Sequence, residues 1–273
     1  MEAIGNIFQV LFTQPITNVL VGFYQLLNSF GVYSALGFSI ILLTVFLRIV
    51  MYPLVSAQIK SSKKMQELNP EMKEIKEKYK NDRKRQQEET MKLYKKYEIN
   101  PASGCLPAII QMPVIFSLYQ VLIHVVAVNS SEKFFSEVTP LLYFDFLKPT
   151  QLWSTSFFGL ALADKPSEIF SANPAIILVP VLTGLFQLVL SKMMMSKAIT
   201  SGKSDDFQSS FMKQSLYIFP IMIGFFSFTL PVGLSLYWNT FTLFGILQQY
   251  LLAGFGGITQ WIPALAKYEK NNG

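Results

Sequence analysis

Five stretches of this chain are apolar over a length that suits a membrane-spanning helix. Crossing about 30 Å of hydrocarbon takes roughly 20 mostly apolar residues in an α-helix. We therefore predict five spans, which cover residues 33–54, 105–128, 174–194, 215–230 and 234–255. The fourth span is short, and only Pro231, Val232 and Gly233 separate it from the fifth. These two spans are expected to form a tight helical hairpin, because Pro and Gly favour a turn.

The longest polar segment, residues 55–104, lies between the first two predicted spans. Its apolar residues recur at intervals of three and four, the spacing of one face of a helix; they are Met65, Leu68, Met72, Ile75 and Tyr79. A second, charged helix is predicted from Arg83 to Tyr97, after Asn81-Asp82. The pattern indicates a helical hairpin that projects from the membrane into the cytoplasm.

Residues 1–32 carry apolar positions interleaved with Gln, Thr and Asn instead of one continuous apolar run. A helix of this kind is typical of a membrane surface, so we predict an amphipathic helix that lies in the outer interface. A short buried span is the alternative that the pattern leaves open. Pro15 is expected to break this helix, because proline has no backbone N–H to donate. Since Glu2 is the only charged residue before Arg48, no cleavable leader is expected.

Basic residues decide the predicted orientation, because short loops rich in Lys and Arg stay on the cytoplasmic side. None occurs before Arg48, whereas residues 60–96 carry many. The N-terminus is therefore expected outside and the C-terminus inside. It follows that residues 129–173 form an outer loop, and that residues 195–214 and 256–273 form a cytoplasmic loop and a cytoplasmic tail.

The composition agrees with a membrane protein and argues against a water-soluble core. Hydrophobic residues make up 51% of the chain, and 24 of its 273 residues are Phe. The formal net charge is +6, but the cations concentrate in residues 60–96, so a cytoplasmic loop explains them without a nucleic-acid partner. The chain has one cysteine, Cys105, and one histidine, His124. Neither an internal disulfide nor a metal site is therefore expected, and no cofactor is indicated.

Arg48 is the most informative residue, since it lies inside the first predicted span. A rise of about 1.5 Å per residue places it roughly 22 Å from the outer end, in the inner half of the bilayer. An arginine at such depth costs roughly 2.5 to 3.5 kcal/mol on insertion scales. Its side chain either extends to the inner interface beside Lys60 and Lys63 or faces a hydrated cavity. No predicted span contains Asp or Glu, so water, lipid phosphate or an acidic incoming ligand remain as its partners.

A hydrated cavity needs further polar walls, and the spans supply them. The candidate residues for binding a ligand there are Arg48, Thr44, Gln111, Gln187, Tyr237, Asn239 and Thr240. Any one of them can instead serve only as a hydrogen bond between helices. Together with a buried cation, a wet groove is the better explanation. A hydrolytic triad, a proton relay around His124 and a Gly-rich phosphate loop cannot be assembled from this sequence, so no enzymatic activity is expected.

Several segments match one protein family in order and spacing. They are Gly37-Phe38-Ser39-Ile40-Ile41, Arg48-Ile49-Val50-Met51-Tyr52-Pro53-Leu54, Asn100-Pro101, Gly104-Cys105, Leu106-Pro107-Ala108-Ile109-Ile110-Gln111-Met112-Pro113-Val114-Ile115-Phe116, Pro231-Val232-Gly233-Leu234-Ser235-Leu236-Tyr237-Trp238 and Gln248-Gln249. With these segments the chain resembles the YidC family of membrane protein insertases from about residue 15 to residue 255.

The resemblance implies a core of five helices around a positively charged hydrophilic groove, open to the cytoplasm and to lipid but closed outside. Arg48 matches the groove arginine, and Thr44, Gln111, Asn239 and Thr240 are expected along or near the groove. The third and fifth spans would guide a client helix, and the cytoplasmic hairpin would recruit clients. The implied function is that of an insertase and chaperone of the bacterial inner membrane, which releases client helices sideways into the bilayer, alone or with the Sec translocon.

The sequence departs from some family members in two places. The large outer domain of Gram-negative members is missing, so a minimal form is expected. After Phe255 the only cations are Lys267 and Lys270, which argues against ribosome docking through the tail. The expected partners are nascent membrane proteins, phospholipids and the Sec translocon, and the ribosome stays open as a further partner.

Two other classes of function stay open from the residues alone. One is a small transporter or channel in which Arg48 selects an anion, although the internal repeats typical of transporters are not evident. The other is an assembly platform that folds clients after a translocon has inserted them.

Overall fold

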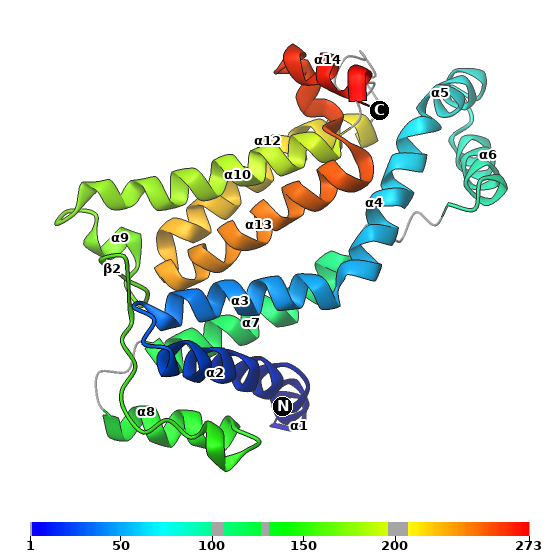
Figure 1. Ribbon diagram of the computed structural model, residues 1–273. Coiled ribbons are helices and arrows are strands. Elements are labelled where there is room, and N and C mark those ends of the chain that lie inside the picture. The colour runs from blue at the N-terminus through cyan, green and yellow to red at the C-terminus, as the bar shows by residue number, and fades with distance from the viewer. Residues whose placement is uncertain (1, 100–105, 127–130, 196–206, 273) are drawn as a thin grey trace. The chain divides into compact units, whose positions relative to one another are not determined.

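The computed structural model describes residues 2–99, 106–126, 131–195 and 207–272, and these residues are mostly helical (Figure 1). They separate into two compact units. Unit 1 comprises residues 1–50, 109–187 and 218–244, and unit 2 comprises residues 51–108, 188–217 and 245–273. Residues of both units occur in the long helices α7 (Leu106–Val126), α10 (Leu178–Met194), α12 (Phe207–Thr229) and α13 (Val232–Ala253). The predicted motif residues at 100–105, including Cys105, and the side chain of His124 lie outside the described part.

Two helical stretches of the described residues are long and apolar enough to cross a membrane, Gly5–Ser29 and Pro174–Met193. A third meets the same test if α3 (Ala35–Val50) and α4 (Tyr52–Glu67) count as one span. The single helix predicted over residues 33–54 is thus interrupted at Met51. Pro53 explains the interruption, because its ring and missing N–H disfavour a continuous helix across the preceding turn. The mostly helical fold is confirmed, whereas the number of five spans remains a prediction.

The N-terminal region is a continuous run of helix, and the predicted break at Pro15 is wrong. It consists of α1 (Glu2–Phe8), a π-helical turn (Gln9–Thr13) and α2 (Gln14–Ser29). Because Pro15 donates no hydrogen bond, the turn before it widens instead of ending, and the N–H of Gln14 donates to the carbonyl of Gln9. The interfacial location of this region remains a prediction, because part of it also meets the test for a span.

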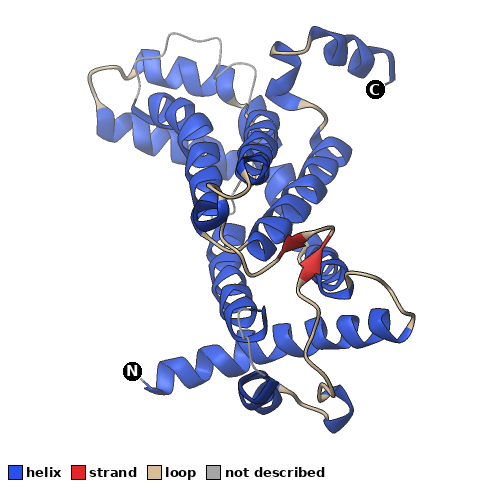
Figure 2. Ribbon diagram, turned by 90° about the vertical axis from the view of Figure 1, so that its left-hand side faces the viewer, coloured by secondary structure: helices blue, strands red, loops and turns tan. Residues whose placement is uncertain are grey.

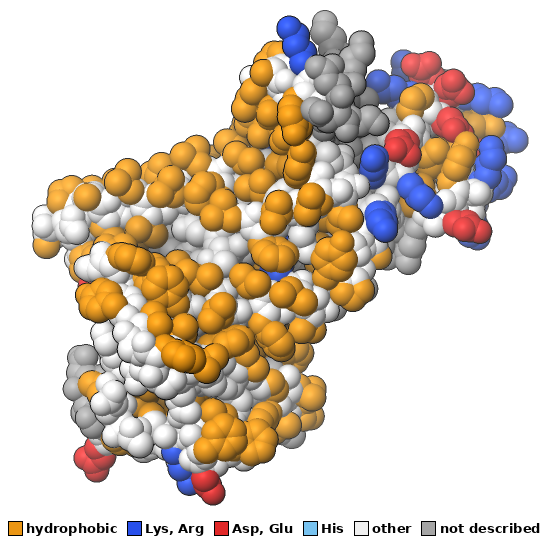
Figure 3. Space-filling model, in the orientation of Figure 1, with side chains coloured by type: hydrophobic (Ala, Val, Ile, Leu, Met, Phe, Trp, Pro, Cys, Tyr) orange, Lys and Arg blue, Asp and Glu red, His pale blue; other side chains and the backbone are white. Residues whose placement is uncertain are grey.

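The core of unit 1 forms where α2, α3, α7 and α13 meet. Its fully buried apolar side chains come from all four helices and from the segment before α9 (Pro166–Ile169); they include Leu20, Leu36, Ile40, Leu118, Leu122, Leu162 and Leu234. Large apolar side chains on the outward faces of α10 and α12 stay exposed, among them Val181, Leu185, Ile221 and Phe225. Figure 3 shows such hydrophobic side chains spread over the helices of this unit. Apolar exposure on this scale is what lipid contact requires.

Residues 131–177, predicted mainly as an outer loop, contain defined structure. They form α8 (Ser131–Val138), 3-10 turns at Thr139–Leu141 and Asp145–Leu147, strands β1 (Ser156–Phe157) and β2 (Leu160–Ala161), α9 (Pro166–Ile169) and a 3-10 turn at Pro174–Ile177. The two strands, drawn red in Figure 2, pair antiparallel with Ser156 opposite Ala161 and Phe157 opposite Leu160.

Asn18 of α2 holds residues 131–153 by binding backbone groups of this segment. The side-chain amide of Asn18 donates to the carbonyl of Leu141 at 2.8 Å, and its Oδ1 accepts from the N–H of Tyr143 at 2.8 Å. Asn18 is 8% exposed, so both bonds are largely shielded from water. Six residues further along α2, Tyr24 stacks on Trp153 with a centroid distance of 4.0 Å. The N-terminal helix therefore fixes the position of residues 131–153.

Replacing Asn18 by leucine, which has a similar volume, is expected to loosen this segment. The carbonyl of Leu141 and the N–H of Tyr143 would lose their partners, at a cost of roughly 1–3 kcal/mol for buried backbone groups. Hydrogen exchange of residues 139–147 in detergent should then become faster, while exchange in α13 stays unchanged. Equal protection of residues 139–147 in both proteins would contradict a clamping role for Asn18.

In unit 2, α5 (Asn69–Lys78) and α6 (Arg83–Lys96) pack against each other through a small apolar cluster. The cluster contains Leu68 and Met72 of the predicted stripe together with Leu93, Tyr94 and Ile99, and Met65 and Ile75 lie beside it. The opposite faces are charged, as Figure 3 shows over α5 and α6. That this pair of helices projects into the cytoplasm remains a prediction.

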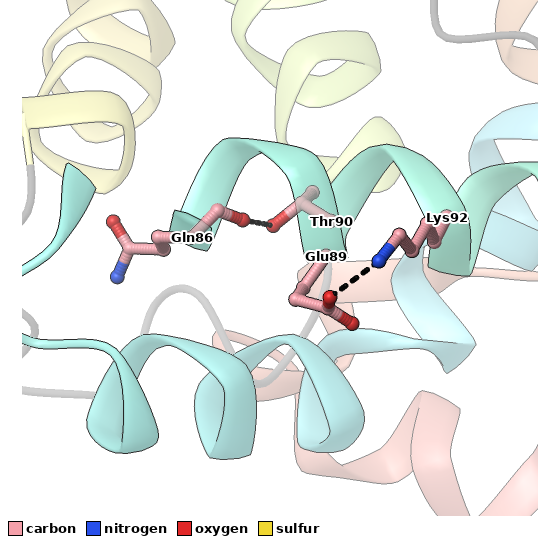
Figure 4. Close-up of polar contacts among 4 residues, drawn as sticks. All are labelled: Gln86, Glu89, Thr90 and Lys92. Atoms are coloured by element: carbon pink, nitrogen blue, oxygen red, sulfur yellow. Dashed lines mark hydrogen bonds and ion pairs between the residues drawn. The ribbon is translucent and has the colours of Figure 1, made fainter. Parts of the chain in front are cut away.

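Exposed polar interactions lie along the charged face of α6 and at its end. Glu89 and Lys92 form an ion pair at 2.8 Å, and Thr90 donates to the carbonyl of Gln86 (Figure 4). The hydrogen bond from Lys92 lowers the pKa of Glu89. The hydroxyl of Tyr97 donates to Glu71 of α5 at 2.8 Å, and this bond raises the pKa of Tyr97. Such exposed pairs add little stability, so the apolar cluster holds the two helices together.

The residues that follow α13 are folded and pack against the end of α10. They form a 3-10 turn (Gly256–Gln260) and α14 (Pro263–Asn272). Gly257 packs on the end of α10, where an added Cβ would lie 2.7 Å from the carbonyl oxygens of Lys192 and Met195. Lys192 is 3% exposed; its ammonium donates to Gln260 at 3.1 Å and lies 4.9 Å from the ring centroid of Trp261.

Helices α10 and α12 approach closely at two glycines. An added Cβ on Gly184 would lie 3.3 Å from the carbonyl oxygen of Pro220, and one on Gly224 would lie 3.3 Å from that of Pro180. Each helix thus places its glycine against the proline of the other. The same pair is joined by a buried hydrogen bond between the hydroxyls of Thr183 and Ser227 at 3.1 Å. Small residues and hydroxyls are the usual means of packing helices in a membrane, where apolar burial gives no net drive.

Candidate functional site

Arg48 lies near the end of α3 with its side chain buried inside unit 1. It is 4% exposed. Its Nη2 donates to the carbonyl oxygen of Phe241 in α13 at 2.5 Å, and its Cζ lies 3.4 Å from the centroid of the Phe241 ring. A carbonyl dipole and an aromatic face both attract a cation, but neither carries a full negative charge. The guanidinium therefore stays within the helical core instead of extending to an exposed surface.

Two further polar side chains lie beside this contact. Tyr237 is 1% exposed, and its ring stacks on Phe241 one turn along α13 with a centroid distance of 5.8 Å. The amide of Gln111 in α7 donates to the hydroxyl of Tyr237. Three helices thus contribute to one group of side chains, and we call Arg48, Gln111, Tyr237 and Phe241 the Arg48 cluster.

Two acceptor atoms at or near this cluster are buried without a hydrogen-bond partner among the residues that the structure describes. They are Oε1 of Gln111 and Oδ1 of Asn239, a residue that lies between Tyr237 and Phe241 on α13. A buried acceptor left in this state costs about 1–3 kcal/mol. Such atoms in folded proteins usually face a water molecule or a ligand. The cluster therefore offers places where a donor from outside the chain can bind.

The other predicted site residues make different contacts. The hydroxyls of Thr44 and Thr240 donate to carbonyl oxygens one turn earlier in their own helices, those of Ile40 at 2.6 Å and Leu236 at 2.8 Å. This is a common way for Ser and Thr to satisfy their hydroxyls inside a helix. Gln187 accepts a long hydrogen bond of 3.5 Å from Thr242 and so links α10 to α13.

Phe241 is not among the site residues predicted from the sequence. A prediction of a wet groove rests on polar side chains, and the side chain of Phe241 is apolar. The sequence gives one indication that Phe241 belongs to the site. It lies four residues after Tyr237, and residues four apart share a helix face. Lys192 gives no comparable signal in the sequence, yet the residue is buried and its ammonium donates to Gln260.

The chemistry of the Arg48 cluster is that of a binding site. It offers a cation, one amide group and a phenol within an apolar surrounding, and the amide of Asn239 lies nearby on α13. Within the described residues there is no group of three or more His, Cys, Asp or Glu that could hold a metal ion. The strongest ligand for such a site would be an anion, because a carboxylate can accept two parallel hydrogen bonds from a guanidinium.

Comparison with known proteins places the chain among membrane proteins of one kind. The family described as 60Kd inner membrane protein matches residues 22–256. The membrane protein insertase YidC of Fusobacterium nucleatum is 35% identical over 228 residues, which cover 83% of this chain and 91% of that protein. The insertase YidC of Oceanobacillus iheyensis is 32% identical and covers 90% of this chain and 84% of its own. The insertase MisCA of Bacillus subtilis is 37% identical over 80% of this chain and 70% of its own.

The fold agrees with a solved structure. An active YidC insertase, crystallised with its first transmembrane domain resolved, matches with a TM-score of 0.55 and 29% identity. The match covers 88% of this chain and 46% of that chain, so this protein spans about half the length of the solved one. The resemblance inferred from the sequence is confirmed, and the chain belongs to the 60Kd inner membrane protein family, the family of the YidC membrane protein insertases.

Proposed function

We propose that this protein is a membrane protein insertase and chaperone that accepts client segments at the Arg48 cluster. The observation that carries the proposal is the buried guanidinium of Arg48, held between α3 and α13 by a carbonyl and an aromatic ring. The helices that form the cluster contain no Asp or Glu, so the site carries a positive charge. Its relatives named as insertases support the general function.

In the proposed mechanism the cluster lowers the cost of moving a polar client segment into the membrane. Burying an unpaired polar group costs several kcal/mol in hydrocarbon, and burying a charge costs more. A client carboxylate would replace the carbonyl and ring of Phe241 as the partner of Arg48, because a charge-assisted pair is stronger than either. Donors of the client backbone would bind Oδ1 of Asn239 and Oε1 of Gln111. The hydrophilic groove thus consists of the cluster and the water around it.

The apolar part of the client would then leave sideways into lipid. The exposed apolar side chains of α10, such as Val181, Leu182 and Leu185, form a surface along which a client helix can slide. Transfer of the client helix from water to hydrocarbon drives this step, so no nucleotide is needed. No covalent bond forms or breaks in this scheme.

We place the protein in the bacterial inner membrane as a multi-pass protein, with its N-terminus outside and its C-terminus in the cytoplasm. The uneven distribution of Lys and Arg supports this orientation, because none occurs before Arg48 and many lie in residues 60–96. The helices α5 and α6 would then lie in the cytoplasm, where their charged faces can meet clients before insertion. Phospholipids and the Sec translocon are the further partners that we propose.

The test is reconstitution without a translocon. Liposomes that contain only this protein are given a small single-span client with an acidic outer tail, and protease protection of the tail measures insertion. We expect insertion well above that of protein-free liposomes, and less when the acidic residues of the client tail are replaced by Asn and Gln. Insertion no better than in empty liposomes would refute autonomous insertion and leave the assembly platform as the function.

A further inference from the structure

The segment that follows α8 exposes three aromatic rings. The side chains of Tyr143, Phe144 and Phe146 are each at least half exposed, and Phe146 is 73% exposed. The rings of Phe144 and Phe146 stack with a centroid distance of 5.3 Å, so they lie on the same side of the backbone. The ring of Tyr143 lies edge-on to that of Phe144 at 6.4 Å. These three side chains, which we call the aromatic tip, form one apolar surface.

The aromatic tip is fastened to α2 at both of its ends. On one side Asn18 binds the backbone of Leu141 and Tyr143, as described above. On the other side the amide of Gln25 donates to the carbonyl oxygen of Leu147 at 2.7 Å. The side chains of Leu141 and Leu147 are both buried. The exposure of the rings between them is therefore a fixed feature of the fold.

A charged pair lies next to the rings. Asp145 is placed between Phe144 and Phe146, its side chain is 93% exposed, and its carboxylate pairs with the ammonium of Lys148 at 2.6 Å. The hydrogen bond from Lys148 lowers the pKa of Asp145, so the carboxylate is ionised at neutral pH. Ionised groups are costly inside hydrocarbon, whereas exposed rings are costly in water. The boundary between headgroups and acyl chains accommodates both kinds of group side by side.

The element to which the aromatic tip is fastened indicates lipid as its partner. The helical run of α1 and α2 has no charged residue after Glu2, and its part Gly5–Ser29 is apolar enough for a membrane. This run exposes further large apolar side chains, namely Ile7, Val10, Leu11 and Leu26. The aromatic tip thus belongs to a larger surface that suits contact with lipid, and its charged pair suits the headgroups.

We propose that the aromatic tip is a membrane anchor, whose three rings insert to a depth of about 5–10 Å at the boundary between headgroups and acyl chains. Asp145 and Lys148 stay among the headgroups and water. Through Asn18 and Gln25 the anchor holds α2 and residues 131–153 against the lipid surface. Aromatic side chains are enriched at this level of membrane proteins, because their rings are apolar and rigid. The inference does not depend on client binding at the Arg48 cluster.

The test reads the surroundings of each side chain with a nitroxide spin label. Single cysteines replace Phe144, Asp145, Phe146 or Lys148 in the full chain with Cys105→Ser, and each labelled protein is placed in liposomes of phosphatidylcholine and phosphatidylglycerol. Molecular oxygen concentrates in lipid, and a water-soluble nickel complex stays outside it. We expect the ratio of oxygen to nickel accessibility to be about threefold or more higher in Phe144→Cys and Phe146→Cys than in Asp145→Cys and Lys148→Cys.

Asp145→Cys and Lys148→Cys are the matched controls, since they carry the same label one or two residues away from the rings. All four positions are exposed, so an unchanged midpoint of thermal unfolding shows that each variant is folded. The inference is overturned if the nickel complex reaches positions 144 and 146 as readily as positions 145 and 148, because the rings then lie in water. It is also overturned if both reagents are excluded from positions 144 and 146, because a second copy of the chain then covers the rings.

A further variant tests whether the rings hold the segment in place. Tyr143→Cys carries the label in a chain with Phe144→Ser and Phe146→Ser, and in a chain that keeps both phenylalanines. Without the two rings the ratio of oxygen to nickel accessibility at position 143 should fall by about twofold or more, because the segment loses the apolar groups that insert into lipid. An unchanged ratio would refute the anchoring role of the rings. Client insertion does not enter this measurement, so its result is independent of the proposed insertase activity.

Discussion

Arg48→Glu is expected to reduce client insertion by about 10- to 100-fold, because it reverses the only charge of the cluster. An interaction of a few kcal/mol between a buried cation and a client carboxylate is lost, and roughly 1.4 kcal/mol corresponds to each factor of ten. Arg48→Ala should be impaired less strongly, and Arg48→Lys should keep most of the activity if charge alone matters. Insertion of a single-span client with an acidic tail into liposomes measures all three variants.

Lys148→Ala is the matched control, since it removes one positive charge at an exposed position outside the cluster. It should insert the client as well as the unchanged protein does. Equal losses in Arg48→Ala and Arg48→Lys would show that the geometry of the guanidinium matters more than its charge. Full activity of Arg48→Glu would remove Arg48 from the proposed mechanism.

Gly224→Leu is expected to separate α10 from α12 and to lower stability by about 1–3 kcal/mol, the usual cost of overpacking. Even a Cβ at this position would lie 3.3 Å from the carbonyl oxygen of Pro180. This oxygen belongs to the backbone, so it cannot move aside by a change of side-chain rotamer. The midpoint of thermal unfolding in detergent, followed by helical circular dichroism, should fall.

Gly22→Leu provides the control for this prediction. An added Cβ on Gly22 of α2 meets nothing within 4 Å, so leucine should be tolerated there and should even favour the helix. A Gly224→Leu protein with an unchanged midpoint would show that the two helices can part without cost. Loss of stability in both variants would point to a general effect of leucine and not to the crossing.

Much of the helical pattern could be predicted because it depends on local sequence. The apolar stripe of Leu68 and Met72 follows the helical period, and both residues are buried in the expected cluster. Arg48 stood out because a charge within an apolar run is costly whatever the fold around it. Its contact with Phe241, by contrast, joins residues 193 positions apart, and an apolar partner gives no signal in a search for polar walls.

The structure of residues 131–177 could not be predicted, for a different reason. Asn18 binds backbone atoms of residues 141 and 143, and any sequence presents the same carbonyl and N–H there. Residues 156–164 likewise bind α13 through backbone groups. They approach α3 at Gly37, where the lack of a side chain leaves room for the ring of Phe157. The prediction of a break at Pro15 is wrong because a π-helical turn accommodates a residue without an N–H donor, and the helix continues.

The 3-10 turn at Gly256–Gln260 packs on the end of α10, and this contact limits where the chain can be shortened or fused to a reporter. A reporter fused directly after Ala253 would remove the amide of Gln260 and the ring of Trp261, and the ammonium of Lys192 would lose both of these neighbours. A reporter joined beyond α14 leaves these contacts in place. A fusion that preserves the contacts at the end of α10 must therefore follow Trp261.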